Sequence, residues 1–539
     1  MMNRWILAIT AAVLAGLSTL PQRGEALSSI VLASAAWACV LWVVMSPARR
    51  RRGRPPGSGA AWASWQDVAP LAAPGPFLLG LWPGTRARLY LGQEQFSGHV
   101  LVLGPSRSGK TAGVIAPNVL LRDPTRESTV VLDVKTGARS LWNITAGRYG
   151  PQAHLFCPLF EGSVPYNPLE EIDSIGAAQR KAWLLVLNTT PRSLSGDARV
   201  YAAASADLAA LLFLYVQQDR HSGGHTVGAV FRLLMGGSGA VREALRGSRI
   251  AAVRERAGLF AARERRVQDA AVTGLLERLA PWADPLINEA TARHWDLRTL
   301  GREASALYVL LPEAESARLH PLVAWLVADL LDGLIDEADR TGLRVPVRIF
   351  LDEFARFGYL VGLSDRLPTL RERGVSVLMG AQVASQIEEV YGWRGARSLI
   401  GNTETKLIFR AGDLETARMV SAWLGQTSVP EVSVTTRGRR VRSMTVHPRL
   451  RPLMPVEEMT RLPEGAMIAL SGAFHPCRLQ QARYFEEPRF EILPPPFPLR
   501  PRSIAQAFPI TPAGEARPTH RIPAPRPAGG VAIARDVHT

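Results

Sequence analysis

The residues best suited to chemistry are a lysine and a threonine that end a glycine-bracketed loop. Residues 104–112 read GPSRSGKTA and contain the pattern G-x-x-x-x-G-K-[ST], with an apolar run at 100–103 before it and a helical segment after it. Glycines let successive N–H groups turn toward a phosphate, and the helix N-terminus adds partial positive charge there. We expect Lys110 to reach the β- and γ-phosphates and Thr111 to ligate Mg²⁺. The expected nucleotide-binding residues are Gly104, Pro105, Ser106, Arg107, Ser108, Gly109, Lys110, Thr111 and Ala112.

A second chemical motif is an acidic pair at the end of an apolar strand. Residues 347–354 read VRIFLDEF, the pattern of a Walker B element. We expect Asp352 to hold Mg²⁺, directly or through water, and Glu353 to orient or deprotonate the attacking water. A solvated acidic turn is the alternative, and the phosphate loop in the same chain weighs against it.

Polar residues also end two other expected strands. Asp133 and Lys135 lie at the end of the strand at 129–134, where charged side chains commonly face the ligand crevice of a parallel sheet. Gln382 follows the strand at 376–381, and its amide is placed to sense the γ-phosphate or position water. These residues complete the expected nucleotide site within one chain.

Two arginines, Arg371 and Arg373, lie between the Walker B strand and Gln382. Either is a candidate arginine finger that reaches the nucleotide of a neighbouring subunit. A surface arginine is the more common alternative for each residue taken singly.

The elements that position these residues alternate between strands and helices. Between 170 and 299 the pattern changes to helices only, which predicts an all-α domain inserted into one α/β domain. The α/β domain would then comprise residues 78–169 and 300–487. The expected strands are at 100–103, 129–134, 154–156, 306–311, 347–351, 376–381 and 406–410. The expected helices of the insertion include 181–188, 200–218, 227–235 and 251–279.

The N-terminus has the pattern of a membrane hairpin. Apolar runs at 5–20 and 27–45 are separated by only PQRGEA, and a bilayer-spanning helix needs about 20 residues. Arginines flank both ends, so the positive-inside rule places both flanks in the cytoplasm. A signal peptide over the first run is disfavoured because no small-x-small cleavage site precedes the second. This predicts a transmembrane hairpin at 1–54.

The remaining segments are rich in proline and basic residues. Residues 55–77 are expected to be a linker, and residues 488–539 a disordered Pro/Arg-rich tail. The basic cluster at 437–442 is expected to be a loop. The net charge of +16 favours an acidic partner, either nucleic acid or an anionic lipid surface, unless it merely reflects an arginine-rich composition. The three cysteines have no metal or disulfide spacing.

A longer series of motifs resembles the coupling-protein family of type IV secretion and conjugation, the TraG/TraD-like ATPases. In order, the motifs are GPSRSGKT, LDVKTG, VPYNPL, LYVLLP, FLDEFARFG, GAQVASQIEEVYG and GNTETKLIF. A closing block, RLRPLMPVEEMTRLPEGAMIALSGAFHPCRL, completes the series. The resemblance covers about residues 100–486 and is more specific than the Walker motifs alone.

The resemblance implies a RecA-like P-loop domain with an inserted all-α domain. It implies a homo-hexamer on the bacterial inner membrane that hydrolyses ATP with Mg²⁺. The implied substrate is DNA, single-stranded and attached to a relaxase, delivered to the channel of a type IV secretion system. Carried onto this chain, it assigns catalytic roles to Lys110, Glu353 and Gln382, and makes Arg371 the first choice for the finger. The pair Asp133 and Lys135 matches the D-x-K segment of the family.

This chain departs from the family pattern in two places. The segment between its two apolar runs is much shorter than the usual periplasmic segment, and DVKTG lacks the acidic residue that follows the glycine in many relatives. Two other functions remain open at this point. One is an FtsK/HerA-like DNA pump in chromosome or DNA processing, and the other is a receptor for secreted proteins that uses ATP to change shape.

Overall fold

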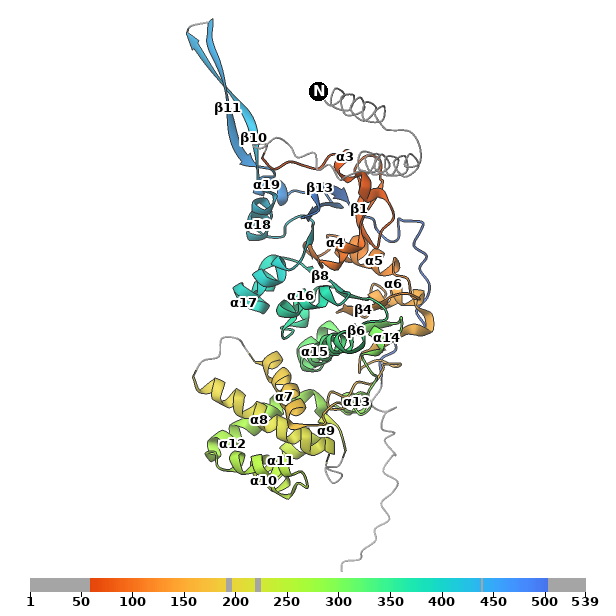
Figure 1. Cartoon of the computed structure of the whole chain (residues 1–539), viewed down its shortest axis with the longest axis vertical. Helices are drawn as coiled ribbons and strands as arrows, with labels where there is room; N and C mark the ends of the chain where they lie inside the picture. Colours follow the sequence, from red (N-terminus) through yellow and green to blue (C-terminus); the bar gives the residue numbers. More distant parts are fainter. Residues whose placement is uncertain (1–58, 191–195, 219–223, 438–439, 503–539) are drawn as a thin grey trace, which may run out of the picture. The chain divides into compact units, whose positions relative to one another are not determined.

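The computed structural model describes residues 59–190, 196–218, 224–437 and 440–502 (Figure 1). Within the described residues there are two compact units: the larger comprises residues 61–426 and 450–502, and the smaller includes residues 427–437 and 440–449. The expected transmembrane hairpin at 1–54 lies outside the described residues.

The larger unit is organised around a mixed sheet of eleven strands, in the order β2-β1-β13-β12-β9-β3-β8-β7-β4-β6-β5. The seven strands from β9 to β5 are parallel, and the other four add antiparallel pairs at one side. The parallel strands are Val100–Leu103 (β3), Ser128–Asp133 (β4), Ala153–Phe156 (β5), Ala306–Leu310 (β6), Val347–Leu351 (β7), Val375–Ala381 (β8) and Thr405–Ile408 (β9). The antiparallel strands are Phe77–Leu81 (β1), Arg88–Leu91 (β2), Ala466–Ser471 (β12) and Phe474–Gln480 (β13).

All seven strands predicted from apolar runs are confirmed as the parallel part of this sheet. Their residues are almost all buried, as expected where helices cover both faces of parallel strands. The hydrophobic core joins Val131, Tyr308, Phe350 and Leu378 of neighbouring strands with Trp142 of a covering helix. The fold is therefore α/β with a large mixed sheet.

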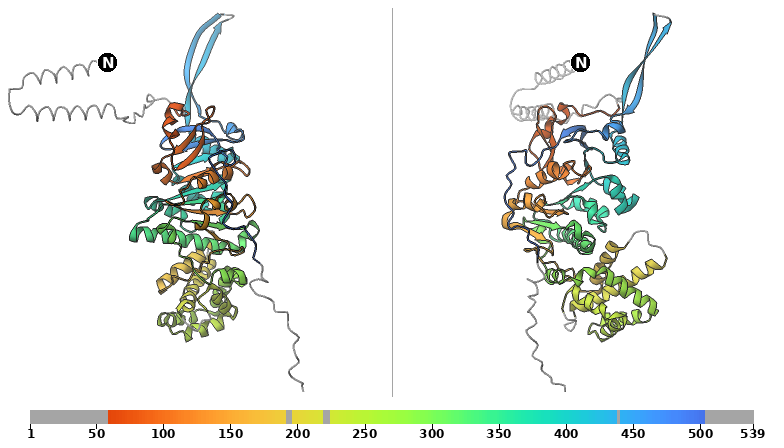
Figure 2. Two further views of the ribbon diagram at one scale, coloured as in Figure 1. Left: turned by 90° about the vertical axis from the view of Figure 1, so that its right-hand side faces the viewer. Right: turned by 180° about the vertical axis from the view of Figure 1, so that it is seen from behind.

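Helices and short turns connect these strands (Figure 2). The helices are Trp65–Val68 (α3), Gln93–Ser97 (α4), Ala116–Leu120 (α5), Leu141–Thr145 (α6), Ser316–Thr341 (α15), Leu363–Glu372 (α16), Ala384–Gly401 (α17), Leu414–Leu424 (α18) and Val456–Met459 (α19). A π-helical turn, Thr111–Ile115 (η2), precedes α5, and a 3₁₀ turn, Phe354–Phe357 (η7), follows β7.

Between β5 and β6 the described residues form helices and no strand. They are Ile175–Thr189 (α7), Asp197–Gln218 (α8), Val227–Met235 (α9), Gly237–Gly247 (α10), Ala251–Ala261 (α11), Arg265–Arg278 (α12), Pro285–Ala290 (α13) and Thr299–Arg302 (α14).

Among the described helices, α8 alone is long and apolar enough to cross a membrane by length and composition. More than half of its apolar window is buried inside the protein, and α8 packs against α7 and α12. Burial of this kind is typical of a core helix in a globular domain.

The helix expected over 251–279 is divided into α11 and α12. The buried side chain of Gln268 explains the break, because its Nε2 donates to the carbonyl oxygens of Ala261 (3.2 Å) and Arg263 (2.7 Å). These hydrogen bonds satisfy backbone carbonyl groups at the end of α11 and stabilise the turn between the two helices.

The expected linker at 55–77 is wrong over its second half. Residues 65–72 form α3 and a 3₁₀ turn, and Val68 is fully buried. The Trp65 ring lies 5.8 Å from the ring of Trp82. Apolar side chains within a Pro/Ala-rich stretch therefore anchor this segment on the sheet domain.

The expected disordered tail is also wrong over its first residues, because 488–502 pack on the larger unit. The Phe497 ring lies 4.9 Å from the Trp142 ring, and Trp142 Nε1 donates to the Phe497 carbonyl oxygen (3.2 Å). Arg502 pairs with Glu289 of α13 at 2.7 Å. The packing of this segment could not be predicted from its proline-rich sequence, because an extended segment without hydrophobic periodicity can still bury single side chains. Residues 503–539 lie outside the described residues.

The basic cluster at 437–442 lies where two long strands meet. Gln426–Arg437 (β10) and Arg440–Pro452 (β11) pair to form a two-stranded sheet that belongs mainly to the smaller unit. The predicted loop over 437–442 is wrong for Arg437, the last residue of β10, and for 440–442, the first residues of β11. Val and Thr residues on both sides favour extended structure.

Candidate nucleotide-binding site

The phosphate-loop motif forms the connection from β3 to η2. Lys110 is 5% exposed, and its Nζ donates to the carbonyl oxygens of Gly104 (2.6 Å) and Pro105 (3.2 Å). Gly109 has a φ of +98°, and a Cβ atom on it would meet the terminal amide group of the Gln481 side chain. The loop therefore needs glycine at 109 for its backbone conformation.

The helix after the loop starts with a π-helical turn. This turn, Thr111–Ile115, ends two residues before Pro117 of α5. Proline has no N–H to donate to the carbonyl of Gly113, four residues earlier, so the regular α-helical ladder cannot form there. The widened turn follows from this missing donor and places Thr111 at the start of the helix.

The residues expected to hold Mg²⁺ are in direct contact. Thr111 Oγ1 donates to Asp352 Oδ2 at 2.7 Å. Lys135 Nζ donates to the same Oδ2 atom (2.6 Å) and to Thr111 Oγ1 (3.2 Å). The other carboxylate oxygen of Asp352 is buried and has no hydrogen-bond partner among the described residues. A hydroxyl beside a buried, partly unsatisfied carboxylate is a donor set that suits a hard cation such as Mg²⁺.

Asp133 lies behind this cluster at the end of β4 and is fully buried. Its two oxygens accept hydrogen bonds from the backbone N–H groups of Lys135 (3.0 Å) and Leu141 (2.7 Å). Burial raises the pKa of Asp133, and the nearby charge of Asp352 raises it further. Burial alone would lower the pKa of Lys135, but the carboxylates of Asp352 and Asp133 raise it overall. Lys135 is therefore the cation that compensates these carboxylates.

For Lys110, which is expected to bind phosphate, burial and neighbouring charges act on the pKa in the opposite balance. Burial lowers the pKa of Lys110, and the charges of Glu353 and Asp352 only partly offset this effect. Ser108 Oγ is also buried and lacks a hydrogen-bond partner among the described residues. A buried ammonium and an unsatisfied hydroxyl on one loop suit a ligand with several phosphate oxygens.

Glu353 and Gln382 meet, as their positions on neighbouring strands predict. Gln382 Nε2 donates to Glu353 Oε2 at 3.0 Å, and β8, which ends before Gln382, lies between β3 and β7. Glu353 has a left-handed backbone with φ +54°. Sequence analysis missed Arg356, whose Nε lies 3.1 Å from the same Oε2 atom. In the sequence, the only indication of this contact is the position of Arg356, three residues after Glu353.

The structure does not bring the two candidate finger arginines to the chain's own site. Arg371, near the end of α16, pairs with Glu404 at 3.0 Å. Glu404 comes just before β9, so it lies at the amino end of the parallel strands, whereas the phosphate loop follows the carboxyl end of β3. Arg373 pairs with Asp339 at 2.7 Å. A role of Arg371 toward a neighbouring subunit stays a prediction.

The segment after β13 covers the phosphate loop and was not predicted. The Tyr484 N–H donates to the carbonyl oxygen of Ala112 (3.0 Å), and the Gln481 side chain lies against both Gly109 and Gly113. Arg483 pairs with Glu464 at 3.0 Å. No short motif marks this contact, because it joins segments that lie far apart in the sequence.

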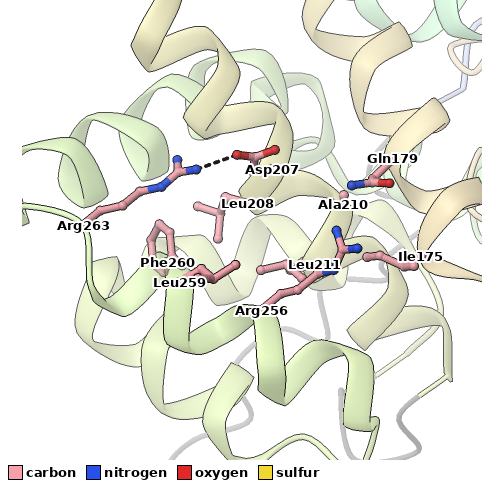
Figure 3. Close-up of a pocket in the computed structure, with 10 residues that line it drawn as sticks. All are labelled: Ile175, Gln179, Asp207, Leu208, Ala210, Leu211, Arg256, Leu259, Phe260 and Arg263. Carbon is pink, nitrogen blue, oxygen red and sulfur yellow. Dashed lines mark hydrogen bonds and ion pairs between the residues drawn. The ribbon is translucent and has the colours of Figure 1, made fainter.

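A separate cavity lies among the helices α7, α8 and α11 (Figure 3). Its volume is about 120 Å³, and an ion pair between Arg263 and Asp207 (2.6 Å) lies beside it. None of the expected nucleotide-site residues lines it. The candidate site is thus the cluster at the carboxyl edge of the parallel strands.

A comparison of the chain with models of protein families identifies the family to which it belongs. The family model described as "Type IV secretory system Conjugative DNA transfer" matches residues 67–502. The chain belongs to this family. The conjugal transfer protein TraG of Escherichia coli is 26% identical over 462 residues, which cover 76% of this chain and 71% of TraG. The protein VirD4 of Agrobacterium fabrum (strain C58 / ATCC 33970) is 22% identical over 401 residues, which cover 72% of this chain and 59% of VirD4.

Solved structures of the plasmid coupling protein TrwB share the fold. The complex of TrwB with ADP and Mg²⁺ matches with a TM-score of 0.61 and 18% identity, covering 83% of this chain and 98% of TrwB. The complex with a non-hydrolysable GTP analogue gives a TM-score of 0.63 at 17% identity, with the same coverage of both chains. The resemblance to the TraG/TraD-like coupling proteins is therefore confirmed at the level of family and fold.

Proposed function

We propose that this chain is the coupling ATPase of a conjugative type IV secretion system. It uses ATP hydrolysis to deliver DNA, single-stranded and attached to a relaxase, to the secretion channel. The observation that carries the proposal is the convergence of Lys110, Thr111, Asp352, Glu353 and Gln382 at one edge of the sheet. Family membership supplies the context of conjugative transfer.

Each residue of the cluster has a distinct task in hydrolysis. Lys110 and the loop N–H groups bind and orient the phosphates. Thr111 and Asp352 hold Mg²⁺, which neutralises charge on the phosphates when it is bound. Glu353 accepts a proton from the attacking water or orients that water, and Gln382 fixes the Glu353 side chain. The contacts of Thr111 with Asp352 and of Gln382 with Glu353 support these proposed roles.

The finer architecture belongs to the same proposal. Residues 170–299 act as an all-α domain inserted in a RecA-like domain formed by 78–169 and 300–487. Residues 1–54 form a two-span hairpin that holds the chain in the bacterial inner membrane, with the bulk of the chain in the cytoplasm. The chains assemble as a homo-hexamer in which Arg371 reaches the nucleotide of a neighbour.

The test is DNA transfer between cells that carry the conjugative element with this gene. Replacing Lys110 with Ala should abolish transfer while the protein remains at its normal level in the membrane fraction. Arg126→Ala serves as a control, because Arg126 is exposed and lies outside the cluster. Normal transfer with Lys110→Ala would refute the proposal. A defect in chromosome segregation with normal transfer would instead favour the FtsK/HerA-like pump.

A further inference from the structure

An exposed tryptophan on α17 carries an arginine against its ring. Trp393 lies in the second half of this helix and is 55% exposed. The guanidinium carbon of Arg397 lies 4.1 Å from the centroid of the Trp393 ring. This contact covers one part of the aromatic surface, and the exposure of Trp393 leaves another part open to a ligand. An open aromatic ring beside an arginine is an arrangement on which the bases of single-stranded nucleic acids stack.

The charge around this ring is positive. Arg394 and Arg397 are exposed, and neither forms an ion pair with a residue that the structure describes, whereas two arginines of the neighbouring helix α16 pair with carboxylates. The helix α17 is kinked at Gly392 (φ +69°), and its acidic residues come before the kink. Residues 393–401 therefore carry positive charge without acidic side chains, which suits the phosphates of a nucleic acid.

The spacing of the three side chains favours a single strand over a duplex. Trp393 and Arg394 precede Arg397 by four and three residues, so the three side chains lie on one face of the helix. In a duplex, the bases are stacked on one another and their faces are closed to a tryptophan ring. In a single strand, a base can stack on the ring while the neighbouring phosphates reach the guanidinium groups.

The first half of α17 connects this surface to the proposed catalytic residues. The helix begins two residues after Gln382, whose Nε2 donates to Glu353 Oε2 at 3.0 Å. Just before the kink, Tyr391 is fully buried, and its ring lies 5.9 Å from the ring of Phe354, the residue after Glu353. The hydroxyl oxygen of Tyr391 also accepts a hydrogen bond from the Leu360 N–H (3.3 Å). A ligand bound after the kink thus acts on a helix that contacts the hydrolysis site in two places.

We propose that Trp393, Arg394 and Arg397 form a contact surface for single-stranded DNA, with a base stacked on the tryptophan and phosphates at the two arginines. The inference rests on the proposed function in DNA delivery and names residues that contact the strand. Because α17 starts beside the hydrolysis site, the same residues carry the stimulation of ATP turnover by DNA. A second copy of the chain is the other partner that such a surface accommodates, and it would have to supply carboxylates to both arginines.

The experiment measures binding of a fluorescently labelled oligothymidylate to the full chain in detergent at several salt concentrations. Trp393→Ala should weaken binding about tenfold, as expected for loss of one stacked base, with the same salt dependence because the ring is uncharged. Trp393→Phe should retain most of the affinity. Arg394→Gln and Arg397→Gln should each reduce the slope of log K against log salt by about 0.7. Binding of a duplex should be unchanged in Trp393→Ala.

A second readout and a control variant complete the test. The concentration of single-stranded DNA that gives half-maximal stimulation of ATP turnover should rise about tenfold in Trp393→Ala, in line with the lost affinity. Trp183→Ala removes a tryptophan of 42% exposure from α7 and should leave DNA binding unchanged.

The outcomes separate failure of this inference from failure of the proposed function. An original chain that binds no single-stranded DNA would overturn the proposed DNA delivery itself. Binding by the original chain that is unaltered in Trp393→Ala, with equal salt slopes in both arginine variants, would overturn this surface alone. A changed oligomeric state of these variants in size-exclusion chromatography, with unaltered DNA affinity, would also overturn it and would assign the surface to a contact between copies of the chain.

Discussion

Protonation of one buried histidine should make the folded chain acid-sensitive. His99, just before β3, is 1% exposed. Its Nδ1 accepts a hydrogen bond from the Val377 N–H (3.0 Å), so the ring proton is on Nε2, which donates to the Leu367 carbonyl oxygen (2.7 Å). A second proton would have to replace the bond from Val377. Burial lowers the pKa of His99 from 6.5 to about 4; the Leu367 carbonyl opposes this shift and Arg371 adds to it.

The size of the effect follows from the two pKa values. Between pH 6.5 and about 4 the unfolded chain binds a proton at His99 and the folded chain does not. The free energy of unfolding therefore falls as the pH falls through this window, and His99 contributes no change above it. At about 1.4 kcal/mol for each pKa unit, the loss reaches about 3 kcal/mol near pH 4.

The assay is urea unfolding of the full chain in detergent at several pH values between 7.5 and 4.5. His99→Asn should flatten the pH dependence, because asparagine tolerates the left-handed backbone here (φ +61°) and has no ring to protonate. Burial also lowers the pKa values of His154, His294 and His320, so the difference between the variant and the original chain is the relevant quantity. The exposed residue His475 provides the control, His475→Asn. Equal pH dependence in the original chain and His99→Asn would refute the reasoning.

Three further predictions concern the site and the C-terminal segment. Lys135→Met should lower the free energy of unfolding by about 3 kcal/mol in Mg²⁺-free buffer, because it leaves the buried carboxylate of Asp352 without its cation. This value is at the low end of the range for broken buried ion pairs, since the lysine side chain is 35% exposed. Added Mg²⁺ should recover part of the loss in thermal melts, and no response to Mg²⁺ would contradict a cation role for Lys135. Gly109→Ala should weaken binding of a fluorescent ATP analogue about tenfold or more, because alanine is strained at φ +98°; unchanged affinity would show that the loop does not need this backbone conformation to bind the nucleotide. Phe497→Ala should cost about 2 kcal/mol, because this ring is only partly buried against Trp142, and should speed proteolytic removal of the C-terminal residues; Pro498→Ala, at an exposed position, is the control.

The sequence was most informative where function and local structure follow from neighbouring residues. The phosphate loop needs a strand, two glycines and a helix start in series, and all of them lie within 100–120. The strands at 129–134, 347–351 and 376–381 are apolar enough to be recognised without a partner. The polar residues that end them, Asp133, Asp352 and Gln382, therefore had to reach one edge of the sheet.

Contacts between distant segments could not be predicted in the same way. Gln481 packs on Gly109, and Phe497 packs on Trp142, across more than 300 residues of chain. Neither contact leaves a periodic pattern, because each depends on one side chain that fits one space. Arg356 was missed for a related reason, since its two carboxylate partners come from different strands. The break between α11 and α12 depends on the burial of a single glutamine side chain, Gln268, which its sequence neighbours do not reveal.

The most direct test of the central claim is ATP turnover by the full chain in detergent at low salt, with and without single-stranded or duplex DNA. Low salt is chosen because contacts with DNA phosphates are strongest there. DNA should raise turnover severalfold, and Glu353→Gln should abolish it while ATP binding is retained. Turnover that does not respond to DNA would contradict the claim that hydrolysis at this site drives DNA transfer.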